Sequence, residues 1–526
     1  MNRLKTDRSM PGFMHITRRE ALAGLGTGIA ALTLSPRHAD AQEIRRGGTL
    51  NMILEADNKS LDPLFGSSGV DRRTFNLFAE SLLVQPEYGK FDPWLAEGYE
   101  VQDGGKTFIF RLRKGVKFQD GEPFNAAAAK FNLDRLIDPA LKPYPRQYTR
   151  ELKSIEIVDD YTIRTTLTSP SVLFLPMMAA EAGAMMSPKA IKEKGQDFLR
   201  FPIGTGPFKV VSRASGEVVT VRNDTYWQKG ADGKPLPYLD GVRMTVNGNT
   251  AVRLLQMQSG SAQLSDPVSV KDFDTVERDP NLKMLDSVVG GAYVLSFNLD
   301  RLAGKLDLRK AISHGIDRQA MVALVSRGKG TVLTGVEPPF SWAYDADLKG
   351  HEYNPDLAKE EYKRSGNSGP ITLSISQRDD DIQVAEMMQQ MMKDIGLDLK
   401  IEVLERLAYT EKIQVKRDFD LGLSRSPLQR PDIHTQYAFS YSRAATTNYS
   451  GIKDEHLYGL VDQAAQELDR DKRKALYVKI QQVILDNYYQ SFLFWNPRRD
   501  VAAKALNGIA FDATNIWMFD KLWFSA

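Results

Sequence analysis

The chain has 526 residues, of which 42% are hydrophobic and 26% are charged, and it contains no cysteine. This length and composition exclude an intrinsically disordered chain and allow more than one hydrophobic core. The formal net charge of +2 lacks the basic excess that nucleic-acid-binding proteins carry, so we expect no nucleic-acid partner. The lack of cysteine excludes thiol nucleophiles, disulfides, and cysteine-ligated zinc or iron–sulfur sites.

The first 41 residues have the pattern of an export signal. Arg18 and Arg19 precede an uncharged stretch from Ala21 to Leu34, and the small-x-small sequence Ala39-Asp40-Ala41 follows. The stretch is too short to span a bilayer, whereas its tail suits signal peptidase. Residues 17–22 also resemble a twin-arginine signal, which would direct export of the folded protein.

We therefore expect cleavage near Ala41 and a periplasmic location. Removing six basic and three acidic residues changes the formal charge from +2 to −1, so the basicity belongs to the signal. A chain without cysteine has no lipid-attachment site of the lipobox type, and no later segment has the pattern of a membrane span.

The remainder predicts a mixed α/β fold. Alternating apolar residues predict strands at 50–54 and 107–113, and Asn125 is placed to cap a helix over 126–137. Asp307 is placed to cap a second helix from Leu308 to about Arg327.

The clearest local unit is a βαβ unit between Pro370 and Gly422. Alternation at 371–375 and 397–403 predicts two strands, and a helical pattern over 382–395 that ends at Gly396 lies between them. Residues 419–423 predict a further strand of the same sheet. Because ligands of open parallel sheets bind at the carboxyl ends of the strands, the sequence indicates residues 377–381 and 424–430 as site segments. The four methionines at 387, 388, 391 and 392 are expected to fill the core.

Motifs of enzymes are lacking. The sequence contains no G-x-S-x-G, no phosphate-binding G-x-x-x-x-G-K and no H-E-x-x-H. The four histidines after residue 41 are not paired at the spacing of metal ligands, and we expect them to be isolated surface residues. We therefore expect no catalytic residues, no metal and no cofactor.

Several segments, in chain order, resemble one protein family. The most specific is the run from Asp103 to Gly121; residues 48–50, 61–63 and 95–99 precede it, and residues 204–208, 223–227, 238–241 and 307–312 follow. Together they resemble the bacterial extracellular solute-binding proteins of family 5, which serve ABC importers for peptides, nickel and related solutes.

The resemblance implies a type II, two-lobed periplasmic-binding-protein fold and a role in transport. Lobe one would comprise residues 42–292 with an inserted subdomain at roughly 90–203, lobe two residues 293–493, and residues 494–526 would return to lobe one. The chain would cross between lobes near 290–297 and 494. The expected protein is a monomer that closes over a small solute and delivers it to permease subunits in the inner membrane.

One departure from the family bears on the ligand. Peptide-binding members carry a tryptophan after the glycine that corresponds to Gly422 and, four residues beyond that glycine, an aspartate that holds the peptide ammonium; here those positions are Leu423 and Ser426. Arg425 and Arg430 instead favour an anionic solute such as a sugar conjugate or an opine-like compound, because guanidinium groups match carboxylates and phosphates. A structural ion pair with Asp432 is the alternative for these arginines.

Further candidate ligand-binding residues are Tyr293, Trp495, Ser67 and Ser68, together with Ser426. The two aromatic rings could stack on a ligand or belong to the core. Two other functions stay open: an exported hydrolase on the same scaffold, and a binder of a metal or metal chelate in which His434 and the other histidines would be the ligands.

Overall fold

The computed structural model describes residues 44–66, 69–285, 289–426 and 432–525. The predicted export signal and the candidates Ser67, Ser68 and Arg430 lie outside these residues. Within the described residues, no helix is both long enough and apolar enough to cross a membrane.

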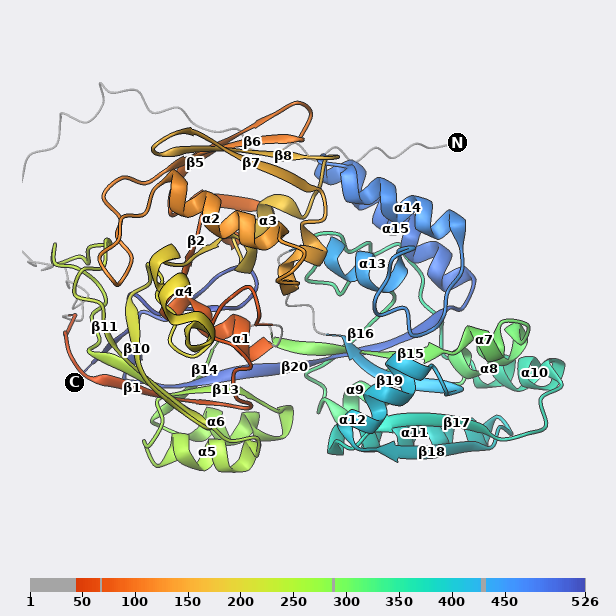
Figure 1. Cartoon of the computed structure of the whole chain (residues 1–526). Helices are drawn as coiled ribbons and strands as arrows, with labels where there is room; N and C mark the ends of the chain where they lie inside the picture. The colour runs from red at the N-terminus through yellow and green to blue at the C-terminus, as the bar shows by residue number, and fades with distance from the viewer. Residues whose placement is uncertain (1–43, 67–68, 286–288, 427–431, 526) are drawn as a thin grey trace, which may run out of the picture. The chain divides into compact units, whose positions relative to one another are not determined.

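A large mixed sheet runs through the chain, and Figure 1 shows its strands. Its order is β10 (Phe208–Ala214), β11 (Glu217–Arg222), β12 (Gly241–Val246), β1 (Thr49–Leu54), β13 (Leu264–Val268), β20 (Gln490–Ala503), β15 (Val289–Phe297), β19 (Leu421–Ser426), β17 (Ile371–Ser376) and β18 (Leu399–Leu404). The short strands β14 (Leu282–Met284) and β16 (Thr331–Val332) pair with β20 off this path.

The fourteen-residue strand β20 connects the two halves of this sheet (Figure 1). One end pairs with β13 and β14, and the other pairs antiparallel with β15, where Val289 lies opposite Arg498 and Ser296 opposite Gln490. The predicted crossings near residues 290–297 and 494 thus fall on two strands that pair with each other. The lobe boundaries themselves stay a prediction.

A separate antiparallel sheet has the order β5 (Ala96–Gln102), β6 (Thr107–Leu112), β8 (Thr162–Leu167) and β7 (Leu152–Asp159). Four two-stranded ribbons complete the strands of the described residues: β2 (Glu80–Ser81) with β9 (Ala184–Met185), β3 (Leu83–Glu87) with β4 (Lys90–Pro93), β21 (Leu506–Asn507) with β24 (Trp523–Phe524), and β22 (Ala510–Phe511) with β23 (Trp517–Met518).

The helices are distributed along the whole chain. They are α1 (Gly69–Thr74), α2 (Ala126–Ile137), α3 (Phe174–Met178), α4 (Pro188–Lys194), α5 (Thr250–Gln258), α6 (Phe273–Arg278), α7 (Leu299–Leu302), α8 (Leu306–His314), α9 (Arg318–Val325), α10 (Pro355–Ser365), α11 (Asp379–Asp394), α12 (Arg406–Tyr409), α13 (His434–Tyr441), α14 (Glu455–Gln466) and α15 (Arg470–Asp486).

Three large apolar cores hold these elements. One is built around β1 and β12, a second under the four-stranded sheet with α2 and α3, and a third from residues between Ala292 and Trp495. Burial of this much apolar surface is the main stabilising contribution to the fold.

Most of the predicted local elements are confirmed. The Asn125 side chain accepts a hydrogen bond from the Ala128 backbone N–H at the start of α2. The βαβ unit is present as β17, α11 and β18, and β17 is parallel to both β18 and β19. Met388 and Met392 are buried, while Met387 and Met391 pack against the same core.

The predicted single helix over 308–327 is wrong. The chain forms α8 and α9 instead, with a break at Gly315 to Asp317. The Asp317 side chain accepts from the Ala320 backbone N–H, 2.9 Å away, and so begins a new helix. Asp307 lies inside the first turn of α8 and does not cap it.

Candidate ligand cavity

A cavity of about 520 Å³ opens where β17, β18 and β19 end at their carboxyl termini. The described residues that line it include Lys59, Ser296, Ser376, Arg378, Asp381, Arg406, Tyr409, Gln414, Ser424, Arg425, Ser426, Gln436, Tyr441, Tyr449 and Gln490, with Val294, Leu407, Leu423 and Phe492 among the apolar ones. The position agrees with the rule that open parallel sheets bind ligands at this edge.

Each of the three parallel strands brings one arginine to the cavity. Arg378 lies two residues beyond the end of β17, and Arg406 lies two residues beyond the end of β18. Arg425 is the last residue but one of β19. Three guanidinium groups therefore converge from neighbouring strands because the strands run in the same direction.

Arg425 is held by contacts that its strand register provides. It lies directly opposite Tyr293 in the β15–β19 pair, and its guanidinium carbon is 5.7 Å from the centre of that ring. Its Nε is 3.5 Å from Asp381 Oδ1, and the Tyr293 hydroxyl donates to the same oxygen at 3.1 Å. Tyr293 and Asp381 thus fix the orientation of the Arg425 side chain.

The other two arginines form no ion pair with a carboxylate in the described part of the chain, although the charge of Asp381 acts on Arg378. Among the described residues, neither Arg378 nor Arg406 forms an ion pair or a side-chain hydrogen bond. Although Arg378 keeps contact with solvent, the protein around its guanidinium and the positive charges of Arg425 and Arg406 lower its pKa. Like charges gathered in this way favour an anion between them.

Asp381 is the one carboxylate among the described lining residues. Its side chain is only 4% exposed, and burial raises its pKa while the charges of Arg425 and Arg378 oppose that rise. Both Arg425 and Tyr293 contact Asp381 through its Oδ1, and their contacts partly neutralise the one carboxylate of the lining.

Neutral polar groups make up much of the remaining wall. The Ser426 hydroxyl donates to Gln436 Oε1 at 2.8 Å, and the Gln436 amide donates to Ser440 at 3.0 Å. The Tyr441 hydroxyl donates to Gln490 at 2.5 Å. Such hydroxyl and amide groups suit a solute with several hydrogen-bonding groups.

Two of the sequence-predicted site residues, Arg425 and Ser426, line the cavity. Tyr293 and Trp495 do not belong to the described lining, because both are in the core. Tyr293 is fully buried and stacks on Phe494, and Trp495 is 3% exposed with its ring edge against Phe340. A Cβ at Gly290 would come within 2.6 Å of the Trp495 ring, so that glycine is required by the close packing.

Arg378 and Arg406 also line the cavity, and neither was named as a candidate from the sequence. The rule that ligands bind at the carboxyl ends of parallel strands indicated residues 377–381. Applied to the end of β18, the same rule also indicates Arg406. The proposed structural pair of Arg425 with Asp432 is also wrong, since Asp432 pairs with Arg473 at 3.2 Å.

The expectation of isolated surface histidines is wrong for His434. It is 2% exposed, and burial and the charge of Arg473 lower its pKa to about 3. His314 lies 2.8 Å from Glu361 through its Nδ1. Within the described residues, no three His, Asp or Glu side chains are grouped as a metal site.

Comparisons with known proteins place the chain in a family. Residues 90–448 match the model of the bacterial extracellular solute-binding proteins, family 5, middle region. The chain belongs to this family. The glutathione-binding protein GsiB of Escherichia coli strain K12 is 30% identical over 371 residues, which are 69% of this chain and 71% of GsiB.

Solved structures of the family have the same fold. DppA of Helicobacter pylori in complex with the peptide STSA is 25% identical with a TM-score of 0.79, covering 92% of this chain and 99% of DppA. AgaA of A. tumefaciens R10 in complex with agropinic acid is 23% identical with a TM-score of 0.77, covering 91% and 99%. The protein is thus a type II, family 5 solute-binding protein of ABC importers and not an enzyme.

Proposed function

We propose that this family 5 protein is exported, that its signal is removed near Ala41, and that it captures a small anionic solute for delivery to ABC permease subunits. The solute carries a carboxylate or phosphate group on a polar body, as a sugar conjugate or an opine does. Supporting this proposal are the relatives, which are periplasmic binding proteins, and the chemistry of the cavity.

The single observation that carries the ligand class is the convergence of Arg378, Arg406 and Arg425 on one cavity. Two of these arginines have no carboxylate partner among the described residues, and the third shares Asp381 with Tyr293. Bringing like charges together costs free energy in the empty protein, so an anion at this point is strongly favoured.

The same cavity is unfavourable for a peptide held by its amino terminus. A bound ammonium needs an acceptor, and leaving it without one costs several kcal/mol. Asp381, the one carboxylate among the described lining residues, is only 4% exposed and already contacts Arg425, and Ser426 stands where peptide-binding relatives carry an aspartate. Anionic groups are therefore the expected anchors of the solute.

Calorimetric titration of the protein freed of bound solute tests the proposal. The panel contains two anionic solutes, agropinic acid and glutathione. Trialanine is the comparison, a tripeptide whose side chains carry no charge. We expect an anionic member to bind, and we expect Arg378→Gln and Arg425→Gln each to weaken that binding by about tenfold or more, the effect of losing a charge-assisted hydrogen bond.

Arg301→Gln is the matched control, because Arg301 is an exposed arginine that pairs with Asp418 and Asp420 away from the cavity. It should leave affinity unchanged. Micromolar binding of trialanine that survives both cavity substitutions would contradict the proposed ligand class.

A further inference from the structure

The pleat of strand β19 separates the charged contacts of the cavity from its neutral ones. Successive residues of a strand point to opposite faces of the sheet. Arg425 accordingly contacts Asp381, which lies in α11. The next residue, Ser426, contacts Gln436, which lies in α13. A solute held by the arginines therefore also meets a wall of uncharged polar groups on the side of α13.

Four side chains of this neutral wall form one chain of hydrogen bonds. Ser426 contacts Gln436 at 2.8 Å, Gln436 contacts Ser440 at 3.0 Å, and Ser440 contacts Thr447 at 3.1 Å. At the far end, the Thr447 hydroxyl donates to the backbone carbonyl of Phe439 at 2.9 Å. All four side chains line the cavity.

The Phe439 carbonyl fixes the direction of the whole chain. A carbonyl oxygen only accepts, so the single hydroxyl proton of Thr447 is used there, and Thr447 accepts from Ser440. Having given its own proton, Ser440 must accept from the amide nitrogen of Gln436. The amide oxygen of Gln436 then faces Ser426 and accepts its proton.

The chain ends at Ser426 with unused hydrogen-bonding capacity. The Ser426 proton is committed to Gln436, while its oxygen still accepts, and none of the described residues donates to it. Gln436 keeps a second amide hydrogen, for which the described part of the chain provides no acceptor. A hydroxyl group donates and accepts at one oxygen atom, whereas an ether or carbonyl oxygen only accepts and an amide nitrogen only donates.

We propose that Ser426 and Gln436 select a solute with hydroxyl groups on its body, so that the ligand is a hydroxylated acid. The solute hydroxyl donates to Ser426 and accepts from Gln436. This inference rests on the proposed anionic solute and adds the second contact that the solute makes. The arginines attract any acid of suitable size, because a charge carries no information about the rest of the molecule, and the neutral wall restricts that remainder.

A solute without hydroxyl groups binds less well for a physical reason. It displaces water from the Ser426 oxygen and the Gln436 N–H and offers no partner in exchange. A polar group that loses its hydrogen bond to water in this way costs free energy.

Calorimetric titration of the solute-free protein with three acids tests the inference. D-gluconate and hexanoate have the same six-carbon chain and one carboxylate each, and only gluconate carries hydroxyl groups. N-acetyldiglycine is an acid with amide N–H groups and no hydroxyl group. We expect gluconate to bind about fivefold or more tightly than either of the others, which is the effect of about one net hydrogen bond.

Two substitutions at Ser426 distinguish selection from a structural role. Ser426→Ala should remove most of the preference for gluconate over hexanoate and leave the affinity for hexanoate unchanged. Ser426→Thr keeps the hydroxyl group and should keep the preference. Gln436→Met should also lower the preference, because the solute hydroxyl then loses its donor.

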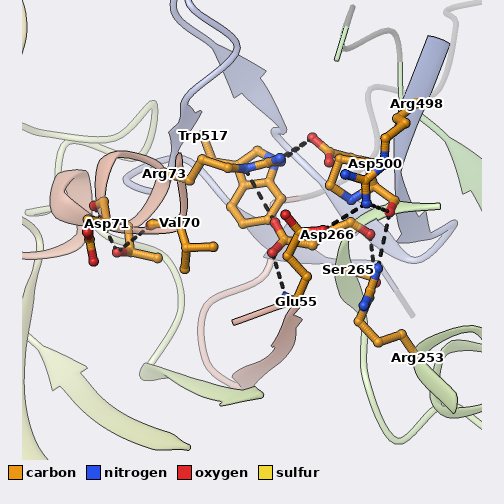
Figure 2. Close-up of polar contacts among 12 residues, drawn as sticks. Glu55, Val70, Asp71, Arg73, Arg253, Ser265, Asp266, Arg498, Asp500 and Trp517 are labelled. Carbon is orange, nitrogen blue, oxygen red and sulfur yellow. Dashed lines mark hydrogen bonds and ion pairs between the residues drawn. The ribbon is translucent and has the colours of Figure 1, made fainter. Parts of the chain in front are cut away.

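Ser265→Ala is the matched control. Ser265 lies among the polar contacts that Figure 2 shows, and it does not belong to the described lining of the cavity. Its buried hydroxyl donates to the Asp266 carbonyl at 3.0 Å. This variant should keep both the affinities and the preference of the unsubstituted protein.

The two proposals fail separately. The hydroxylated solute is overturned if gluconate does not bind, if hexanoate or N-acetyldiglycine binds as tightly, or if Ser426→Ala keeps the preference. If Arg425→Gln still weakens the binding of an acid in any of these cases, the anionic solute stands. If Arg378→Gln and Arg425→Gln leave binding unchanged, the proposed ligand class is wrong whatever Ser426 does.

Discussion

At the scale of residues, three arginines define the chemistry of the cavity. Arg378, Arg406 and Arg425 come from the ends of three neighbouring strands, and the charges of the other two contribute to the lowered pKa of Arg378. Such an arrangement is unfavourable for the empty fold. Ionisable groups with shifted pKa values that lie together in a cleft, without stabilising the fold, are typical of binding sites.

A buried carboxyl near the cavity gives stability a pH dependence. Glu337 is 3% exposed, and burial raises its pKa to about 7, although the hydrogen bond from the Ser341 hydroxyl opposes the rise. Because the pKa of Glu337 is higher in the folded chain, proton binding by its carboxyl stabilises the folded state. This contribution is complete below the pKa of the unfolded chain and is lost as the pH rises through about 7.

We therefore expect Glu337→Gln to flatten the pH dependence. Between pH 5 and pH 8 the free energy of unfolding of the unsubstituted protein should fall by about 2–3 kcal/mol more than that of the variant. The Ser341 hydroxyl can rotate to donate or accept, so it tolerates the amide. Denaturant unfolding at several pH values measures the difference.

The exposed Glu360→Gln variant is the control and should keep the pH profile of the unsubstituted protein. Parallel profiles for Glu337→Gln and the unsubstituted protein would show that Glu337 does not titrate in this range.

Part of the site could be predicted from single residues. Arg425 and Ser426, which line the cavity, could be named as candidates because they follow a recognisable strand and depart from the pattern of peptide-binding relatives. Tyr293 and Trp495 were candidates by residue type alone, and residue type does not reveal that a ring stacks on Phe494 or packs against Gly290. Burial of an aromatic side chain depends on tertiary packing.

At the scale of elements, periodicity and end signals predicted the βαβ unit well. Ile371, Leu373 and Ile375 alternate along β17, and Gly396, with a φ of +91°, ends the turn after α11 as a glycine can. The split between α8 and α9 was missed because the apolar pattern continues through Gly315, while the local capping by Asp317 ends that continuity.

The capping role of Asp317 can be measured directly. We expect Asp317→Ala to lower the free energy of unfolding by about 1 kcal/mol, since it removes the acceptor for the Ala320 N–H. Asp307→Ala is the matched comparison, because Asp307 is partly exposed and lies 3.6 Å from Arg364 in a weak ion pair. Its effect should stay under about 0.5 kcal/mol.

An equal or larger loss of stability in Asp307→Ala, measured by denaturant unfolding under the same conditions, would favour the single helix that begins at Asp307 and contradict the observed break.

At the scale of the whole molecule, the sequence pattern alone does not predict which distant strands pair with one another; that order came from the family resemblance. Strand β20 lies more than 190 residues from β15 in sequence yet pairs with it over most of its length, and β13 and β14 flank its other end. Hydrophobic patterns specify which face of a strand is buried and leave its partner open. The resemblance to family 5 supplied the two-lobed order, and the matched structures confirm the fold.

The central claim is that this protein carries an anionic solute on its arginine cluster. Native mass spectrometry of the purified protein, followed by denaturation and identification of any released compound, tests it most directly. We expect a retained compound that bears carboxylate or phosphate groups and that is lost from the Arg378→Gln, Arg425→Gln double variant. A neutral compound, or a peptide without anionic side chains, that both proteins retain to the same extent would contradict the claim.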